Sequence, residues 1–166
     1  MAEPVDPVHI SVPFVPTPLS VVRKAFQLAG LKSGELVYDP GCGDGRTLVV
    51  AAKEFGARAV GVEIRRDLFE RAVRNVAMAG VEDKVLLLHG SFMRYQVPRA
   101  NVVFLYLLSS INEKLRPRLE EALPPGARIV SHDFAVEKWS PVRIMTLEEH
   151  GRMHRIFYYI SGKSFH

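Results

Sequence analysis

The sequence predicts an α/β fold: a mostly parallel, seven-stranded sheet, doubly wound by helices, with an antiparallel hairpin at its C-terminal edge. Two observations lead to this class. Short apolar runs typical of buried strands alternate with amphipathic helical patterns along most of the 166 residues. The last two runs, at 142–147 and 156–161, have no helical pattern between them and are joined by a turn at Gly151, which indicates a hairpin.

The first predicted helix begins beside a proline. Thr17 has a side chain suited to an N-cap, and Pro18 suits the first helical position because its missing N–H needs no partner there. Apolar residues then recur at helical spacing until Gly30, which ends the helix. We expect the alternation to continue with strands at 35–39, 59–64, 84–90, 101–108 and within 124–134, and with helices at 46–55, 67–80 and 110–123.

Capping boxes mark the starts of two later helices. Asp67 is followed three residues later by Glu70, and Ser110 by Glu113. In such a box the first side chain accepts a hydrogen bond from an N–H of the first turn, and the acidic residue reaches back to the cap. We therefore expect Asp67 and Ser110 to be N-cap residues.

Composition limits the class of protein. The chain is 48% hydrophobic and 24% charged, which suits one globular domain spanning 1–166. No apolar run reaches the roughly 18 residues of a membrane span, and the N-terminus lacks a signal-peptide pattern. We therefore expect a cytoplasmic monomer without a membrane partner. Because the net charge of +4 is spread along the chain, nucleic acid is not an expected partner.

The metal-binding side chains are poorly spaced for a metal site. Cys42 is the only cysteine, so neither an intrachain disulfide nor a cysteine-based zinc site can form. His150 and His154 have an i,i+4 spacing, but Gly151 between them favours a turn over a helix. We therefore expect no metal.

The segment YDPGCGDGR at 38–46 follows the first strand, where open α/β sheets bind ligands. Its glycines, Gly41, Gly43 and Gly45, have G-x-G-x-G spacing, which differs from the G-x-G-x-x-G of dinucleotide sites. Arg46 stands where that fingerprint has its third glycine, and no Gly-Lys-Ser/Thr follows as in a P-loop. The loop therefore suits NAD or a triphosphate poorly.

Acidic residues surround this loop. Asp39 ends the first strand, Asp44 lies within the loop and Glu63 ends the second strand. These charges would repel a pyrophosphate and attract a cation, and a carboxylate at the end of the second strand can accept both hydroxyls of a ribose. The pattern predicts a nucleoside ligand with a cationic or zwitterionic tail.

These motifs carry a resemblance to a known class. DPGCGDGR followed by VGVEI resembles motifs I and II of the class I S-adenosylmethionine-dependent methyltransferases, whose sheet is Rossmann-like. With VPFVPTP at 12–18, LYLL at 105–108 and GARIVSHDF at 126–134, the sequence is similar to the archaeal protein-lysine methyltransferases and their mitochondrial relatives. The resemblance implies S-adenosyl-L-methionine as the cofactor and proteins with accessible lysines as substrates.

The resemblance also implies roles for individual residues. Glu63 would bind the ribose, and the irregular segment 1–17 would fold over the cofactor. An acidic residue after the third strand often contacts the adenine; here Ser91 and Phe92 stand instead and would offer a hydrogen bond and a stacking face. The implied cofactor contacts are Phe14, Thr17, Asp39, Gly41, Gly43, Gly45, Glu63, Ser91, Phe92 and Asn101, the last of which is alternatively a turn residue.

The acceptor site is expected where the fourth strand ends. A lysine amine must first lose its proton, which costs about 4.6 kcal/mol at pH 7, and the apolar stretch LYLL would lower that cost by desolvation. Tyr106 within this stretch is the predicted catalytic residue, which would orient the amine; a buried strand tyrosine is the alternative. His132 and Asp133 are a further candidate pair, more simply explained as a core histidine and its neighbour.

The sequence therefore predicts a methyltransferase that acts on lysine ε-amines of proteins. LYLL argues against enzymes that methylate adenine or glutamine amines, because these typically carry (D/N)PPY at that place. Two alternatives stay open. One is a methyltransferase for RNA or a small molecule, and the other is a non-catalytic nucleotide-binding or partner-binding module with the same fold.

Overall fold

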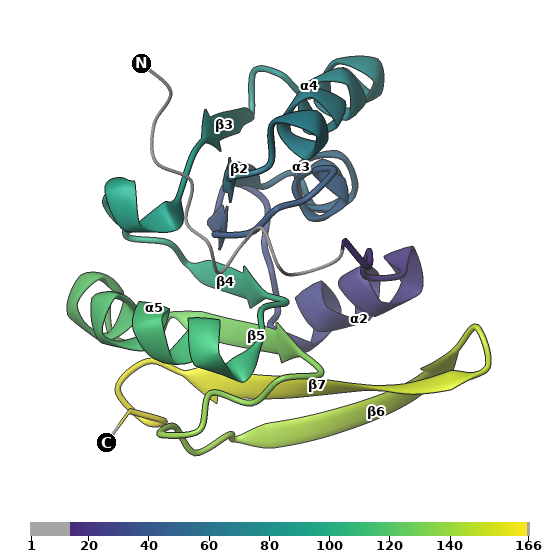
Figure 1. The fold of residues 1–166 in the computed structure, drawn as a ribbon. Coiled ribbons are helices and arrows are strands. Elements are labelled where there is room, and N and C mark those ends of the chain that lie inside the picture. The colour runs from purple at the N-terminus through teal and green to yellow at the C-terminus, as the bar shows by residue number, and fades with distance from the viewer. Residues whose placement is uncertain (1–13, 166) are drawn as a thin grey trace.

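The computed structural model describes residues 14–165, which form a sheet with helices on both faces (Figure 1). Residues 1–13 of the predicted N-terminal segment lie outside this range. In chain order the elements are α2 (Leu19–Leu28), β1 (Leu36–Asp39), α3 (Arg46–Phe55), β2 (Arg58–Glu63), α4 (Arg66–Ala79), β3 (Val85–His89), η1 (Phe92–Arg94), β4 (Val102–Leu105), α5 (Ser109–Ala122), β5 (Arg128–His132), β6 (Arg143–Glu149) and β7 (Arg152–Ile160). Among the described helices, none has the length and apolar character needed to cross a membrane.

Seven strands form one sheet in the order β3-β2-β1-β4-β5-β7-β6. The pairs among β1 to β5 are parallel, whereas β7 pairs antiparallel with both β5 and β6. The predicted mostly parallel sheet with an antiparallel C-terminal edge hairpin is confirmed. The strand order reverses between β1 and β4, and an open α/β sheet has its ligand crevice at the carboxyl ends of the strands beside such a reversal.

Each face of the sheet has its own apolar core. Along β4, Val102 and Phe104 belong to the core beneath α2 and α3, whereas Val103 and Leu105 belong to the core beneath α5. All four side chains are buried, which explains why this strand reads as a continuous apolar run. Figure 1 shows α2, α3 and α4 on one side of the sheet and α5 on the other. The two cores fix the strand ends that carry the candidate site.

All three predicted helix caps are wrong, those of α2, α4 and α5. Pro18 is the N-cap of α2, so Thr17 precedes the cap and its hydroxyl pairs with the ring of His132 instead. Helix α5 begins at Ser109, and no side chain caps it. At Thr17 the residue type was misleading, because His132 competes with the helix end for the hydroxyl.

Other boundaries shift by one to four residues. Helix α4 begins at Arg66, so Asp67 is not its cap; the Asp67 carboxylate instead accepts a 2.8 Å hydrogen bond from the Arg65 guanidinium. Strand β4 ends at Leu105, short of the predicted end at 108. This early end is important for the site, because it releases residues 106–108 from the sheet at its carboxyl edge.

Candidate active site

A cavity of about 310 Å³ opens at the carboxyl ends of the parallel strands. The loop after β1, the end of β2 and the start of α4 form one part of its wall, and the residues that follow β4 form another. Segment 14–17 lies against the same space. Of the predicted site residues, those that line this cavity are Phe14, Thr17, Asp39, Gly41, Gly43, Glu63 and Tyr106.

The glycines of the loop are required by close contacts. A Cβ on Gly43, whose φ is +58°, would lie 2.7 Å from a ring carbon of Phe14. A Cβ on Gly41 would lie 2.8 Å from Leu107. Gly45 does not line the cavity; its φ of +82° starts α3, where a Cβ would lie 3.1 Å from Ala72 of α4. The first two glycines therefore let the walls approach the loop, and the third packs one helix on another.

Glu63 is a buried carboxylate held by the main chain. Its Oε1 accepts a hydrogen bond from the N–H of Gly43 at 2.8 Å, and its Oε2 accepts one from the N–H of Arg65 at 2.9 Å. Each carboxylate oxygen can accept a second hydrogen bond, so both can still receive a ligand hydroxyl. The side chain is thus fixed in place with its remaining acceptor capacity beside the cavity.

Asp39 is held in a similar way but in a less polar environment. Its Oδ2 accepts a hydrogen bond from the Thr47 hydroxyl, and its Oδ1 accepts one from the N–H of Gly41 at 3.2 Å. Burial, together with the neighbouring charges of Glu63 and Asp44, raises the pKa of Asp39 to about 7 despite these hydrogen bonds. A positive ligand group beside Asp39 would restore its ionised form.

Arg46 changes the electrostatics that the sequence predicts for this loop. Its guanidinium donates to the Asp44 carboxylate at 2.7 and 3.1 Å, so the charge of Asp44 is balanced within the loop. The same group donates to the main-chain oxygen of Thr17 at 3.2 Å. The unpaired acidic groups that face the cavity are therefore Asp39 and Glu63, and Arg46 fastens segment 14–17 to the loop.

Aromatic and aliphatic side chains form the other end of the cavity. The half-buried ring of Tyr106 lies against the ring of His132, with centroids 4.1 Å apart, and 6.1 Å from the ring of Phe134. Leu107 and Leu108 continue this wall. Burial and the Asp133 carboxylate raise the pKa of Tyr106, so its hydroxyl stays protonated at neutral pH. This end of the cavity presents apolar surface to a ligand.

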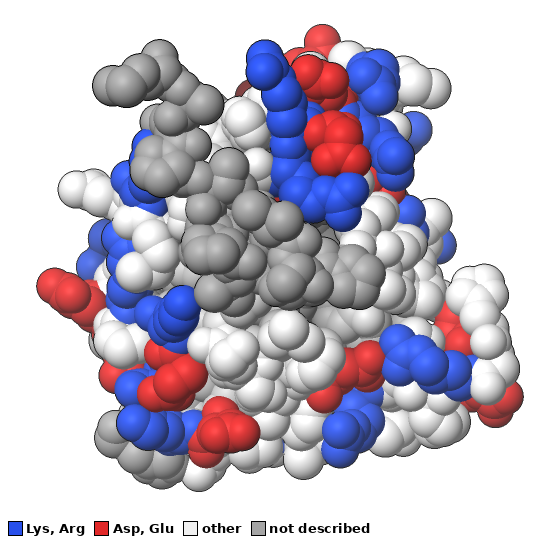
Figure 2. Space-filling view, viewed as in Figure 1, with Lys and Arg blue, Asp and Glu red and all other residues white. Residues whose placement is uncertain are grey.

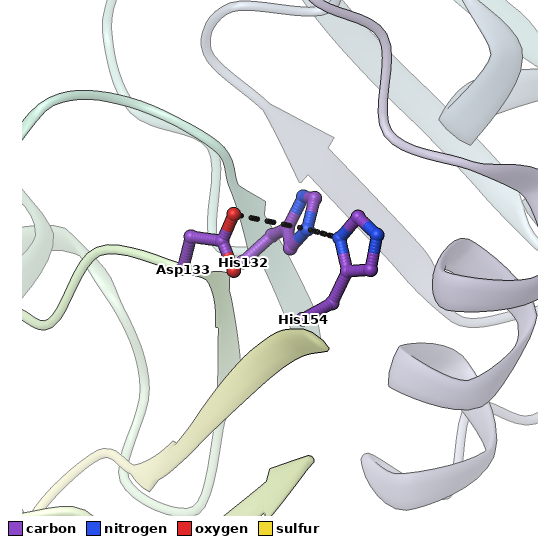
Figure 3. Close-up of side chains that lie close together, drawn as sticks. All are labelled: His132, Asp133 and His154. Atoms are coloured by element: carbon purple, nitrogen blue, oxygen red, sulfur yellow. Dashed lines mark hydrogen bonds and ion pairs between the residues drawn. The ribbon is translucent and has the colours of Figure 1, made fainter. Parts of the chain in front are cut away.

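His132, Asp133 and His154 lie together behind this wall (Figure 3). Nε2 of His132 is 2.8 Å from Nδ1 of His154 and 3.5 Å from the Asp133 carboxylate, and Nδ1 of His132 is 3.0 Å from the Thr17 hydroxyl. Arg152 donates to the Asp133 carboxylate at 2.9 Å. Burial, then His154 and Arg152, lower the pKa of His132 to about 4, so the ring is neutral at physiological pH.

Besides Gly45, three predicted cofactor contacts lie outside the cavity wall. Phe92 is 1% exposed within the core beneath α5, so its ring has no face for an adenine. Asn101 lies just before β4 at the amino edge, where its side chain accepts the N–H of Leu36, and this position argues against a cofactor contact. Ser91 lies at the correct edge and its hydroxyl accepts the N–H of Met93; its contact with adenine stays a prediction.

The sequence reasoning missed other groups that line the cavity. Among them are Ile64 and Leu68, which follow Glu63 in the chain. The participation of His154 was also missed. The proximity of His154 to His132 follows only from the pairing of β5 with β7. This pairing sets His132 opposite Ile156 and so brings His154 close to His132. That register cannot be read from local spacing.

Comparison with known proteins agrees with this geometry. The sequence profile of the ANTKMT methyltransferase domain matches residues 39–143, which is more than half of the chain. A protein-lysine N-methyltransferase of Saccharolobus islandicus is 39% identical over 92% of this chain and 95% of its own length. The adenine nucleotide translocase lysine N-methyltransferase of Mus musculus is 31% identical over 84% of this chain, which spans 60% of that protein.

A solved structure is also similar. The chain of an RNA methyltransferase from Salinibacter ruber, in complex with S-adenosyl-L-homocysteine, superposes with a TM-score of 0.83 and 41% identity, covering 92% of this chain and 97% of its own. Fold and cavity thus define an S-adenosylmethionine-dependent methyltransferase. Within that class, the chain belongs to the ANTKMT methyltransferase family, and the resemblance inferred from the sequence motifs is confirmed.

Proposed function

We propose that this enzyme transfers the methyl group of S-adenosyl-L-methionine to lysine ε-amines of proteins. The observation that carries the proposal is the asymmetry of the cavity. One end presents the buried carboxylates Asp39 and Glu63, and the other presents the apolar surface around Tyr106. The lysine methyltransferase functions named for the archaeal and murine relatives support the same substrate class.

The cofactor fits the acidic end in one orientation. Glu63 accepts the two ribose hydroxyls, and Asp39, with Gly41 and Gly43, surrounds the cationic methionine portion. Beyond Glu63, the apolar side chains of Ile64 and Leu68 line the cavity and offer a surface for the adenine ring. Phe14 and Thr17 cover the cofactor from the N-terminal segment. In this orientation the sulfonium faces the residues after β4.

Methyl transfer is an in-line displacement. The lone pair of the neutral amine attacks the methyl carbon, the C–S bond breaks, and the sulfur keeps the electron pair. The enzyme must therefore lower the proton affinity of the lysine and hold the two atoms in line. The apolar wall of Leu107, Leu108 and Phe134 favours the neutral amine by desolvation, and the nearby sulfonium charge adds to this effect. Tyr106 orients the amine within this wall.

A methyltransferase acting on RNA is the second candidate, because the similar protein from Salinibacter ruber is described as an RNA methyltransferase. Phosphate recognition would require unpaired basic side chains beside the cavity. The two arginines that line it, Arg46 and Arg65, are paired with Asp44 and Asp67. Figure 2 shows basic and acidic side chains side by side on the visible face. These observations favour a protein substrate.

The test is incubation of the purified enzyme with methyl-labelled S-adenosyl-L-methionine and a protein extract, followed by separate protease and nuclease treatments. We expect the label to be lost with protease and to be found on lysine by mass spectrometry. The Glu63→Ala variant should give no label, and Glu82→Ala, which removes an exposed carboxylate far from the cavity wall, should label as the parent does.

Two outcomes would contradict the proposal. Label that survives protease and disappears with nuclease would show that the substrate is RNA. Tight binding of the cofactor without labelling of protein or RNA would instead indicate a binding module that keeps the methyltransferase fold.

A further inference from the structure

Three buried polar side chains form a continuous chain that starts at the cavity and ends in the hairpin. Thr17 is 4% exposed, His132 1% and His154 3%, so none of them relies on bulk water. The Thr17 hydroxyl is 3.0 Å from Nδ1 of His132, and Nε2 of His132 is 2.8 Å from Nδ1 of His154. Nε2 of His154 is 3.3 Å from the main-chain oxygen of Glu149, which ends the chain.

The direction of the hydrogen bonds follows from the last member. A carbonyl oxygen can only accept, so Nε2 of His154 carries a proton. With one proton on each ring, Nδ1 of His154 must accept. Nε2 of His132 is therefore the donor in the histidine pair, and Nδ1 of His132 accepts in turn. The hydroxyl proton of Thr17 must then point toward His132. This single arrangement satisfies each of the three contacts.

A metal ion is a poorer explanation of the same cluster. The ring centres of His132 and His154 are 5.0 Å apart while their facing nitrogens are 2.8 Å apart, so both nitrogens lie between the rings and point at each other. A proton shared by the two nitrogens fits between them. The lone pairs of metal ligands would instead have to converge on the position of the ion. The Asp133 oxygen that faces His132 already accepts a hydrogen bond from Arg152.

The arrangement leaves Thr17 with a defined chemistry toward the cavity. Because its proton is donated to His132, the hydroxyl can only accept a hydrogen bond from a ligand. The main-chain oxygen of Thr17 already accepts a hydrogen bond from Arg46. The hydroxyl cannot donate to a carboxylate. Among the groups expected in this cavity, the matching donors are ammonium or amine N–H groups.

We propose that His132 and His154 are positioning residues which make the Thr17 hydroxyl an obligatory acceptor for an ammonium group bound in the cavity. Two ligands can supply this group, the amino-acid portion of the cofactor and the target lysine; the second rests on the proposed function. His132 has a further role in this arrangement, because its ring supports that of Tyr106 at 4.1 Å between centroids.

The protonation pattern can be tested without any substrate. In ¹⁵N-labelled parent protein at neutral pH, the ring nitrogens of His132 and His154 should both show the Nε2–H form. A proton on Nδ1 of His132 would reverse the chain and overturn the proposal. The exposed His150 serves as the reference for a histidine ring outside this chain of contacts.

The ligand side is tested with Thr17→Val, which removes the hydroxyl at nearly constant shape, and Thr17→Ser, which keeps it. Calorimetry would compare S-adenosyl-L-homocysteine with 5′-methylthioadenosine, which lacks the ammonium group. If Thr17 holds the ammonium of the cofactor, Thr17→Val should lower the affinity for S-adenosyl-L-homocysteine by about tenfold and leave that for 5′-methylthioadenosine unchanged. Thr17→Ser should restore the lost affinity. Thr146→Val makes the same change at an exposed position of β6 and should change neither affinity.

If Thr17 instead holds the lysine, both affinities stay unchanged while KM for a lysine substrate rises about tenfold, again restored by serine. Two results would overturn the proposal. If both nucleoside ligands lose affinity equally, Thr17 only packs the covering segment. If neither affinity nor KM changes, Thr17 contacts no ligand.

His132→Phe keeps a ring against Tyr106 but breaks the hydrogen-bonded chain, and should reproduce the Thr17→Val pattern. His150→Phe is its matched control. Failure of lysine methylation would remove only the KM measurement, because the calorimetric affinities and the proton positions are measured without a lysine substrate.

Discussion

The two ends of the cavity recognise their ligands by opposite means. At the cofactor end, the carboxylates of Asp39 and Glu63 are buried and held by main-chain N–H groups, with acceptor capacity left for a ligand. At the proposed acceptor end, the Asp133 carboxylate accepts hydrogen bonds from the Arg152 guanidinium and from the N–H of Arg155. Rings and aliphatic side chains form the surface there.

The difference has a chemical reason. The cofactor is permanently cationic, so fixed negative charge holds it without changing its reactivity. A lysine must become neutral before it reacts, and a free carboxylate beside it would stabilise the ammonium form and raise the barrier. An uncharged acceptor such as the Thr17 hydroxyl can orient an N–H group with a much smaller effect of this kind. The predictions below test whether charge acts at one end and desolvation at the other.

The largest effect is expected at Glu63. Glu63→Ala removes both ribose acceptors and leaves the N–H groups of Gly43 and Arg65 without their partner. We expect affinity for S-adenosyl-L-homocysteine to fall by tenfold or more, since each charge-assisted hydrogen bond contributes on the order of 1.5–3 kcal/mol. Calorimetry measures this directly, with Glu82→Ala as the control. An unchanged affinity would place the ribose elsewhere.

Gly43→Ala should weaken cofactor binding by about tenfold. The new methyl group would meet the Phe14 ring at 2.7 Å in a backbone with φ of +58°, so the cover over the cofactor must move. Gly80→Ala is a matched control, because its φ is +70° but no atom lies within 4 Å of the added Cβ. Both variants should lose about 1–2 kcal/mol of folding stability, and only the first should lose affinity. Equal affinities would show that Phe14 does not cover the ligand.

These two sites also show what could be predicted from the sequence. The glycine loop and Glu63 are local patterns, each defined by residue type at the end of an apolar run, and the structure places Gly41, Gly43 and Glu63 on one cavity. Asn101 precedes its strand, and the beginnings of parallel strands lie at the edge opposite to the ligand crevice, which argues against its predicted cofactor contact.

Contacts between distant segments could not be predicted. Thr17 has the residue type of a helix cap, but its hydroxyl finds His132, which lies 115 residues further along the chain. The pairing of His132 with His154 depends on the antiparallel register of β5 and β7. The burial of Phe92 likewise depends on how η1 packs beneath α5. None of these facts is encoded in local spacing or periodicity.

At the acceptor end we expect turnover to change while cofactor affinity is kept. Tyr106→Ala removes the ring that lies against His132 and opens the wall to water, so kcat with a lysine substrate should fall by about tenfold or more. Tyr106→Phe keeps the ring and should retain most of the activity if desolvation is the main effect. A loss with phenylalanine as large as that with alanine would assign the role to the hydroxyl instead.

The smallest effect concerns pH and again separates the two ends. Because burial raises the pKa of Asp39 to about 7, this carboxyl is mostly protonated at pH 6 and mostly ionised at pH 8. Only the ionised form attracts the cationic cofactor, so affinity for S-adenosyl-L-methionine should rise severalfold between these values. Calorimetry at both pH values should show a smaller rise for 5′-methylthioadenosine, which lacks the charged tail. Asp39→Asn should remove the rise. If it persists in that variant, another group that titrates near pH 7 controls binding, and the charge at the cofactor end would come from Glu63 alone.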